Sequence, residues 1–138
     1  MKIFIFEGID GAGKTSAIKE LRKNMKGEHP LFIDRFIHSN YVYEKLKGND
    51  TVNDLKLICE DLIRDFEIQV IYIDVSPSRA ISRLSKDFGH GGYTKEILAT
   101  HSVLFEESFK ILNMPLIRIN GDLSLNEMVQ EIMRIICE

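Results

Sequence analysis

The chain has 138 residues, of which 44% are hydrophobic and 28% charged, proportions that suit one globular domain with a core and exclude a disordered chain. Its 18 basic and 21 acidic side chains leave a formal net charge of −3, which disfavours binding to nucleic acid or to an anionic membrane through bulk charge. Two cysteines are too few for a disulfide framework, and the apolar runs are too short to span a membrane. The N-terminal apolar run ends at Glu7 and is too short for a signal peptide. We therefore expect a small cytoplasmic protein.

The first half of the chain predicts two strands and two helices. Residues 3–6 are a short run of β-branched and aromatic residues, typical of a buried strand. After a glycine-rich turn, Ile18, Leu21 and Met25 recur at helical spacing. Residues 31–33 predict a second buried strand, and a further helix is expected after Thr51, with an apolar stripe that runs from Val52 to Leu62.

The second half of the chain continues the same alternation. Residues 70–73 predict a third strand, and the Ser76-Pro77 pair is typical of a helix start. Residues 86–93, which hold Gly89, Gly91 and Gly92, are predicted to form a loop. The next elements are a helix from Thr94 through Leu112, a fourth strand at 116–119, and a last helix that begins with the capping box of Ser124 and Glu127.

This order of elements indicates the fold class. The strands are apolar throughout and alternate with helices, which is the pattern of a parallel sheet covered on both faces. We therefore predict an α/β fold of three layers, α/β/α, with a parallel sheet of about four strands in a single domain over residues 1–138. Because crossovers are right-handed, the carboxyl ends of the strands share one edge of the sheet, where ligands bind.

The strongest motif is a phosphate-binding loop. It spans Gly8, Ile9, Asp10, Gly11, Ala12, Gly13, Lys14 and Thr15, and matches G-x-x-x-x-G-K-[ST] at every fixed position. Glycines allow the backbone N–H groups to surround phosphate oxygens, and the following helix directs its positive end at the anion. Lys14 is expected to reach the β- and γ-phosphates, and Thr15 to present its hydroxyl to Mg²⁺. The loop predicts binding of a nucleoside triphosphate.

Other segments exclude two common classes of phosphate-loop protein. The Asn-Lys-x-Asp guanine-binding motif of small GTPases is absent. The candidate strand ends are Asp34-Arg35 and Asp74-Val75, neither of which has the adjacent glutamate that motor or helicase-type ATPases use to activate water. An arginine beside the aspartate favours binding of a second phosphate over hydrolysis of the first.

Three segments of the sequence carry a resemblance to a known family. They are residues 6–15; the group Asp34, Arg35, Phe36, Ser39 and Tyr43; and residues 71–77 with Ala80 and Arg83. Together they resemble the thymidylate kinase family of nucleoside monophosphate kinases. The resemblance implies a lid around residues 79–93 and transfer of the γ-phosphoryl group of ATP, with Mg²⁺, to a deoxynucleoside monophosphate, dTMP in the first place. The expected partners are small nucleotides and a second copy of the chain in a homodimer.

The resemblance also implies roles for individual residues. The loop from Gly8 to Thr15 would hold ATP, and Asp34 would join Thr15 in the magnesium shell. Arg35 would bind the acceptor phosphate, Asp10 would meet the acceptor sugar, and Arg83 would be the catalytic arginine of the lid. The further candidates for acceptor binding are Phe36 and Tyr43, whose rings can stack on a base. At least one of Phe36, Tyr41 and Tyr43 is expected to be buried in the core instead.

Several assignments leave alternatives open. Asp74 is either a second magnesium-shell carboxylate or a helix-start residue beside Ser76. Arg83 either acts in the lid or lies on a solvated helix face, and Arg35 either binds the acceptor or pairs with a carboxylate such as Glu44. The four histidines show no metal-binding spacing and are expected at the surface or in loops; they are His29, His38, His90 and His101.

The chain departs from the family between the phosphate loop and the second strand. Only residues 16–30 lie there, where family members usually carry an extra strand and helices that help to hold the acceptor. Glu44 also follows Tyr43 where the family often has glutamine. The favoured function is a short monophosphate kinase; the alternatives are a kinase for another small or nucleic-acid acceptor, such as a deoxynucleoside, and a non-catalytic nucleotide-binding protein.

Overall fold

The computed structural model describes residues 2–26, 30–88 and 92–138. It confirms the predicted α/β class. In chain order the elements are β1 (Lys2–Glu7), α1 (Lys14–Met25), β2 (Leu31–Asp34), α2 (Ile37–Leu46), α3 (Val52–Asp65), β3 (Glu67–Asp74), α4 (Pro77–Phe88), α5 (Lys95–Ile111), β4 (Leu116–Asn120) and α6 (Leu125–Ile136).

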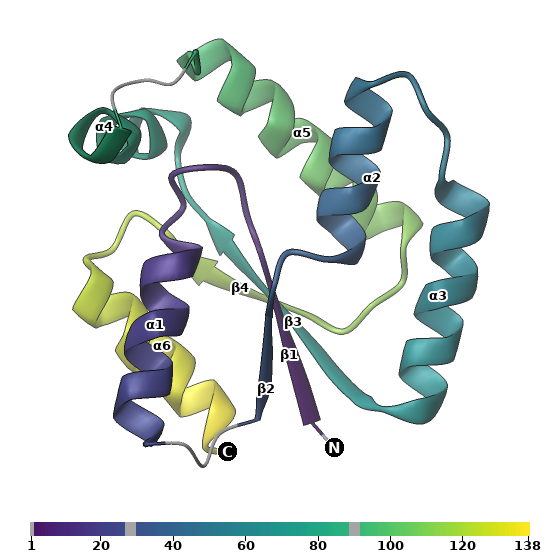
Figure 1. Cartoon of the computed structure of the whole chain (residues 1–138), viewed down its shortest axis with the longest axis horizontal. Coiled ribbons are helices and arrows are strands. Elements are labelled where there is room, and N and C mark those ends of the chain that lie inside the picture. Colours follow the sequence, from purple (N-terminus) through teal and green to yellow (C-terminus); the bar gives the residue numbers. More distant parts are fainter. Residues whose placement is uncertain (1, 27–29, 89–91) are drawn as a thin grey trace.

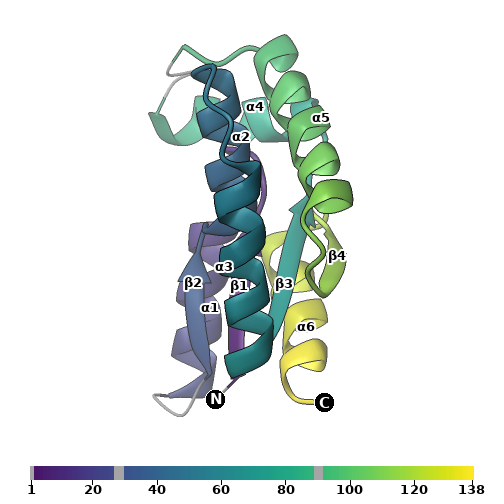
Figure 2. The ribbon, with the colours of Figure 1, turned by 90° about the vertical axis from the view of Figure 1, so that its right-hand side faces the viewer.

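The four strands form one parallel sheet in the order β2-β1-β3-β4. Helices α1 and α6 lie on one side of the sheet, and α2, α3 and α5 lie on the other (Figure 1). Figure 2 looks onto the second side, with the sheet behind α2 and α3. The central strand β1 is the most enclosed, because Phe4 and Phe6 are fully buried and both rings meet Phe32 of β2 edge-on. Because the strands are parallel, the carboxyl ends of β1, β2 and β3 lie at the same edge of the sheet.

Most of the predicted helix starts are confirmed. Pro77 is the first residue of α4, and the Ser76 hydroxyl accepts a hydrogen bond from the Arg79 N–H at 3.2 Å. Thr94 caps α5 in the same way, and the capping box of α6 is complete in both directions. These starts are set by side chains within one turn of the helix, so the local sequence specifies them.

Helix α2 is not among the helices that the apolar pattern predicts. The residue that precedes it, Phe36, has no side chain that can cap a helix. The carboxylate of Glu7, at the end of β1, accepts instead from the N–H groups of Phe36 and Ser39 at 3.3 and 3.1 Å. The Ser39 hydroxyl donates to the same carboxylate. The start of α2 is therefore specified by a residue about thirty positions away.

Two other expectations need correction. The predicted loop at 86–93 begins too early, because α4 continues to Phe88. Of the glycines in this loop, Gly89 and Gly91 lie outside the described residues. Gly92 has a left-handed backbone with φ of 83°.

His38 and His101 were predicted at the surface or in loops, yet both are buried between helices, at 1% and 7% exposure. Both lie on helices that pack against each other, α2 and α5, so their burial depends on tertiary contacts.

Candidate active site

The phosphate loop joins β1 to α1 and packs against α4. Gly11 and Gly13 have φ of 84° and 92°, in the left-handed region that favours glycine. A Cβ on Gly11 would lie 2.4 Å from the carbonyl oxygen of Ala80 in α4, so this position also lacks space for any side chain. Gly13, at a fixed position of the motif, is therefore needed for the turn, and Gly11, at a variable position, is needed both for the turn and for the close approach of α4.

Lys14 is buried inside the curve of this loop. Its exposed fraction is 5%, and its ammonium group donates to the carbonyl oxygens of Gly8 and Ile9 at 3.0 and 3.3 Å. Burial, followed by the charge of Arg35, lowers the pKa of Lys14 to about 8. A buried ammonium group at the start of α1 concentrates positive charge where the helix N-terminus already favours an anion.

The lowered pKa makes nucleotide binding depend on pH in the alkaline range. A bound phosphate stabilises the charged form of Lys14, so binding takes up a proton once pH exceeds the pKa of the free protein. ADP affinity is expected to be nearly constant from about pH 7 to 8 and to fall by up to roughly tenfold for each further pH unit above that range. Titration calorimetry checks this, and Lys14→Arg is the control, because guanidinium keeps its charge over this range. A profile that falls equally in both proteins would contradict the role of Lys14.

Thr15 and Asp34 form the second part of the site. The Thr15 hydroxyl, at the start of α1, donates to a carboxylate oxygen of Asp34, at the end of β2, at 3.0 Å. Among the described residues, no group of three or more histidine, cysteine or acidic side chains could hold a metal ion. Mg²⁺ fits the pair nonetheless, since it is usually bound by one or two protein oxygens together with substrate phosphates and water.

Arg35 lies at the centre of a third group of side chains. Its guanidinium donates to the Tyr43 hydroxyl at 2.7 Å and forms an ion pair with Asp10 of the phosphate loop. The other carboxylate oxygen of Asp10 accepts from the Tyr93 hydroxyl, and this hydrogen bond raises the pKa of Tyr93 to about 12. Arg35 does pair with a carboxylate, as the alternative expected, but the partner is Asp10; Glu44 contacts Asn49 and Lys47 instead.

The backbone of Arg35 is unusual as well. It has φ of 68°, a left-handed conformation that is uncommon for residues other than glycine, while its N–H donates to the carbonyl oxygen of Phe6 at 2.9 Å. Such strain persists only where the surroundings fix it, and it is concentrated at functional sites. It turns the chain at the end of β2, so that Arg35 faces Asp10 and Phe36 next to it remains 39% exposed.

Arg83 contacts the phosphate loop from the α4 side. One guanidinium nitrogen donates to the carbonyl oxygens of Gly11 and Ala12 at 3.3 and 3.0 Å, and the other donates to the carbonyl oxygen of Leu123 at 3.0 Å. The alternative of a solvated helix face is therefore wrong. In this arrangement Arg83 ties the loop to the start of α6.

Asp74 lies outside this group of residues. Its carboxylate is 3.7 Å from Arg118, and burial raises its pKa. The carboxylate at the start of α4 is Asp122, which accepts from the N–H and the hydroxyl of Ser76 at 2.9 and 3.0 Å. Asp74 therefore contacts neither the Thr15–Asp34 pair nor the helix start.

Of the three aromatic residues Phe36, Tyr41 and Tyr43, Tyr41 is the one buried in the core, at 3% exposure.

Sequence reasoning missed three residues of the site. Glu7 is fully buried where β1 meets the phosphate loop, and burial raises its pKa. The sequence predicts Tyr93 only as part of a loop, and His101 at the surface or in a loop. A charged residue that directly follows a buried strand was a usable signal for Glu7, whereas the positions of Tyr93 and His101 depend on how α5 packs against α2.

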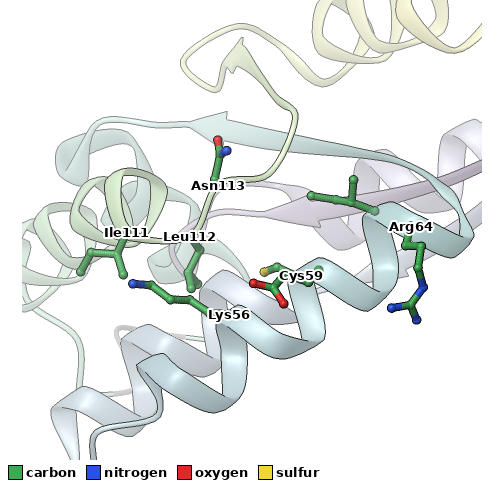
Figure 3. A pocket seen from close by; sticks show the side chains of 8 residues that line it. Lys56, Cys59, Arg64, Ile111, Leu112 and Asn113 are labelled. Carbon is green, nitrogen blue, oxygen red and sulfur yellow. The ribbon is translucent and has the colours of Figure 1, made fainter.

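A pocket of about 470 Å³ lies away from this site, between α3 and the connection from α5 to β4 (Figure 3). Cys59 and Leu112 contribute apolar surface to it, and Lys56 and Arg64 of α3 also line it. None of the residues that line it belongs to the phosphate loop or to the group around Arg35.

None of the described helices is long and apolar enough to cross a membrane.

Comparison with known proteins gives sequence relatives among thymidylate kinases. The chain is 26% identical over 121 residues to the thymidylate kinase of Ureaplasma parvum serovar 3 and 29% identical over 113 residues to that of Leptospira interrogans. The matches cover 83% and 80% of this chain and 53% of each relative, so the chain spans about half the length of the curated relatives it matches. No protein-family model matches the chain.

Solved structures share the fold. The YorR protein of Bacillus subtilis, solved in complex with phosphorylated GDP, superposes with a TM-score of 0.75 at 20% identity, covering 96% of this chain and 94% of that one. Deoxyadenosine kinase from M. mycoides with bound dCTP gives a TM-score of 0.69 at 22% identity, covering 97% of each chain. At these identities the likeness concerns the fold alone.

Proposed function

Because this chain is related in sequence to the thymidylate kinases, we propose that it is a nucleoside monophosphate kinase that transfers the γ-phosphoryl group of ATP to a deoxynucleoside monophosphate, with dTMP as the first candidate. The observation that carries the proposal is the placement of two side-chain pairs around one phosphate loop. Thr15 with Asp34 suits a metal-bound phosphate donor, and Arg35 with Asp10 suits an acceptor.

The donor half consists of the loop from Gly8 to Thr15. Its backbone N–H groups and the N-terminus of α1 bind the phosphates of ATP, and Lys14 neutralises charge on the β- and γ-phosphates. Thr15 and Asp34 would hold Mg²⁺, which would neutralise the negative charge that develops on the phosphates. These groups are held in place by the fold before the nucleotide binds, so little reorganisation accompanies the reaction.

The acceptor half is built around Arg35. Its guanidinium binds the acceptor phosphate and exchanges the carboxylate of Asp10 for the phosphate oxygens. An oxygen of that phosphate then attacks the γ-phosphorus, and the bond from γ-phosphorus to the bridging oxygen of ATP breaks, leaving ADP. Once released by Arg35, Asp10 would meet the acceptor sugar, and Tyr43 and the exposed side chain of Phe36 would contact the rest of the acceptor. Positioning and charge neutralisation account for this chemistry.

We also propose that residues 1–138 form a single domain and that this domain includes a lid. We expect a segment around residues 79–93 to close over the phosphates, with Arg83 as its arginine. Hydrogen exchange across residues 86–93 should slow when a bisubstrate analogue binds, whereas exchange in α3 should remain unchanged. Exchange that is equally fast with and without the analogue would rule out the lid and, with it, the catalytic role of Arg83.

A second candidate is a deoxynucleoside kinase, whose acceptor is a hydroxyl group. The ion pair between Arg35 and Asp10 favours it, because the carboxylate already neutralises the guanidinium that a phosphate would otherwise bind, and a carboxylate near an acceptor hydroxyl can accept its proton. The first candidate is preferred, because it matches the activity for which the sequence relatives are named.

The function is tested by measuring ATP consumption against a panel of deoxynucleosides and their monophosphates in the presence of Mg²⁺. We expect the highest kcat/KM with a deoxynucleoside monophosphate. Higher kcat/KM with an unphosphorylated deoxynucleoside would favour the second candidate. Tight ATP binding without consumption for any acceptor would contradict both and would support a non-catalytic nucleotide-binding protein.

The partners are proposed on the same basis. The substrates are small nucleotides, and the proposed location is the cytoplasm, with Cys59 and Cys137 as free thiols. A homodimer through α3 is favoured by three large apolar side chains on or next to this helix: Leu57, Ile63 and Phe66 are 60%, 46% and 40% exposed. The mass of the protein in solution distinguishes a dimer from a monomer.

A further inference from the structure

His101 of α5 is a buried histidine with an unpaired nitrogen. The residue is 7% exposed, and its Nδ1 atom is buried without a hydrogen-bond partner among the residues that the structure describes. Its ring lies edge-on to the rings of Tyr43 and Tyr93, with centroid distances of 5.7 and 6.3 Å and interplanar angles of 84° and 90°. The imidazole therefore touches both tyrosines of the proposed acceptor site.

These two tyrosines connect His101 to the charged groups of the site. The Tyr43 hydroxyl is bonded to Arg35, and the Tyr93 hydroxyl is bonded to Asp10. Burial lowers the pKa of His101, with smaller and opposing effects from Asp10 and Arg35. The ring is consequently neutral near pH 7, so that one nitrogen donates a hydrogen bond and the other accepts one.

A buried nitrogen without a partner has a cost that an apolar residue would avoid. Leaving such a group unsatisfied destabilises a protein, and features of this kind in a folded protein are expected at functional positions. His38 provides a comparison within the chain. It is also buried, and its Nε2 also lacks a partner among the described residues, while its Nδ1 lies 3.1 Å from the Ser108 hydroxyl; burial alone accounts for its pKa of about 4. Only His101 of these two lies against the Arg35 group.

We propose that His101 determines acceptor specificity, its Nδ1 forming a hydrogen bond with a polar atom on the base of the acceptor nucleotide. This inference rests on the proposed kinase function. An acceptor phosphate that takes Arg35 away from Asp10 also releases the Tyr43 hydroxyl, and the two tyrosine rings that cover the imidazole can then separate to admit the base. His101 would thus supply a contact that the short segment between α1 and β2 lacks the length to provide.

The inference is tested with His101→Leu, which retains apolar volume and removes the nitrogen. With dTMP, or with the best acceptor of the panel, its KM for the acceptor should rise by about tenfold or more, while its KM for ATP stays the same. Its Tm should rise, because the unpaired nitrogen is gone. His101→Asn places an amide near the position of Nδ1 and should restore most of the acceptor affinity, whereas His101→Gln, whose amide lies farther out, should not.

His38→Leu is the matched control, because it removes a buried imidazole from the same helix–helix interface, outside the site. Its KM for the acceptor should equal that of the wild type. An active wild type with an unchanged acceptor KM in His101→Leu would overturn the inference and leave the kinase function standing. Equal increases in His101→Leu and His38→Leu would overturn it too, as an effect of packing. A wild type that phosphorylates no acceptor would overturn both the function and the inference.

Discussion

Replacing Lys14 with alanine is expected to abolish phosphoryl transfer. The ammonium group is buried within the loop, and the phosphates lose both a binding partner in the ground state and a positive charge in the transition state. Removing one preorganised donor lowers kcat by about 10²–10³-fold, and we expect at least this loss because no other lysine belongs to the motif.

The measurement is a steady-state assay with ATP and the best acceptor, combined with ADP titration. Lys19→Ala is the matched control, since Lys19 lies on the exposed side of the same helix. Wild-type turnover in Lys14→Ala would show that the loop does not hold the phosphate donor. An equal loss in the control would indicate damage to α1 instead of loss of the charge.

Replacing Arg35 with lysine is expected to separate the acceptor from the donor half of the site. The guanidinium contacts Tyr43 and Asp10 with different nitrogens, and a lysine ammonium cannot reproduce this planar, two-pronged geometry. We expect kcat/KM for the acceptor to fall by an amount equivalent to about 2–4 kcal/mol, with ADP affinity nearly unchanged.

The substitution leaves the backbone strain as it was, because lysine at φ of 68° meets the same steric conditions as arginine. Arg64→Lys on the exposed side of α3 serves as the control for a general effect of arginine replacement. Full phosphoryl transfer by Arg35→Lys, accompanied only by a change in Tm, would show that the ion pair with Asp10 is purely structural. The acceptor site would then have to lie elsewhere.

Residues of the proposed donor half were easier to identify from the sequence than those of the proposed acceptor half, and the reason is physical. The phosphate loop is continuous in sequence, and its glycines, lysine and threonine act through the local backbone. The motif can therefore be recognised without knowledge of the fold. The group around Arg35 joins residues from the loop, β2, α2 and the start of α5. Of its members, Asp10, Arg35 and Tyr43 were named through resemblance, and none of their mutual contacts was predicted.

The fold shows the same division. Helices capped by their own side chains, such as α5 and α6, were predicted with their first residues nearly correct. Helix α2 was missed because its cap, Glu7, belongs to β1. The strand residues Asp34 and Asp74 looked equivalent in sequence, yet the sheet order places Asp34 beside Thr15 and Asp74 beside Arg118. Local signals therefore specified the elements, and strand order decided which residues meet.

The central claim is that the γ-phosphoryl group of ATP is transferred to the phosphate of a deoxynucleoside monophosphate. It is tested most directly by incubating the protein and Mg²⁺ with dTMP and ATP radiolabelled on its γ-phosphorus, and separating the products. The account predicts that label appears in the β-phosphate of dTDP, at a rate that Lys14→Ala and Arg35→Lys reduce and Lys19→Ala does not. Label found only in free phosphate, at a rate independent of dTMP or any other acceptor monophosphate, would contradict it.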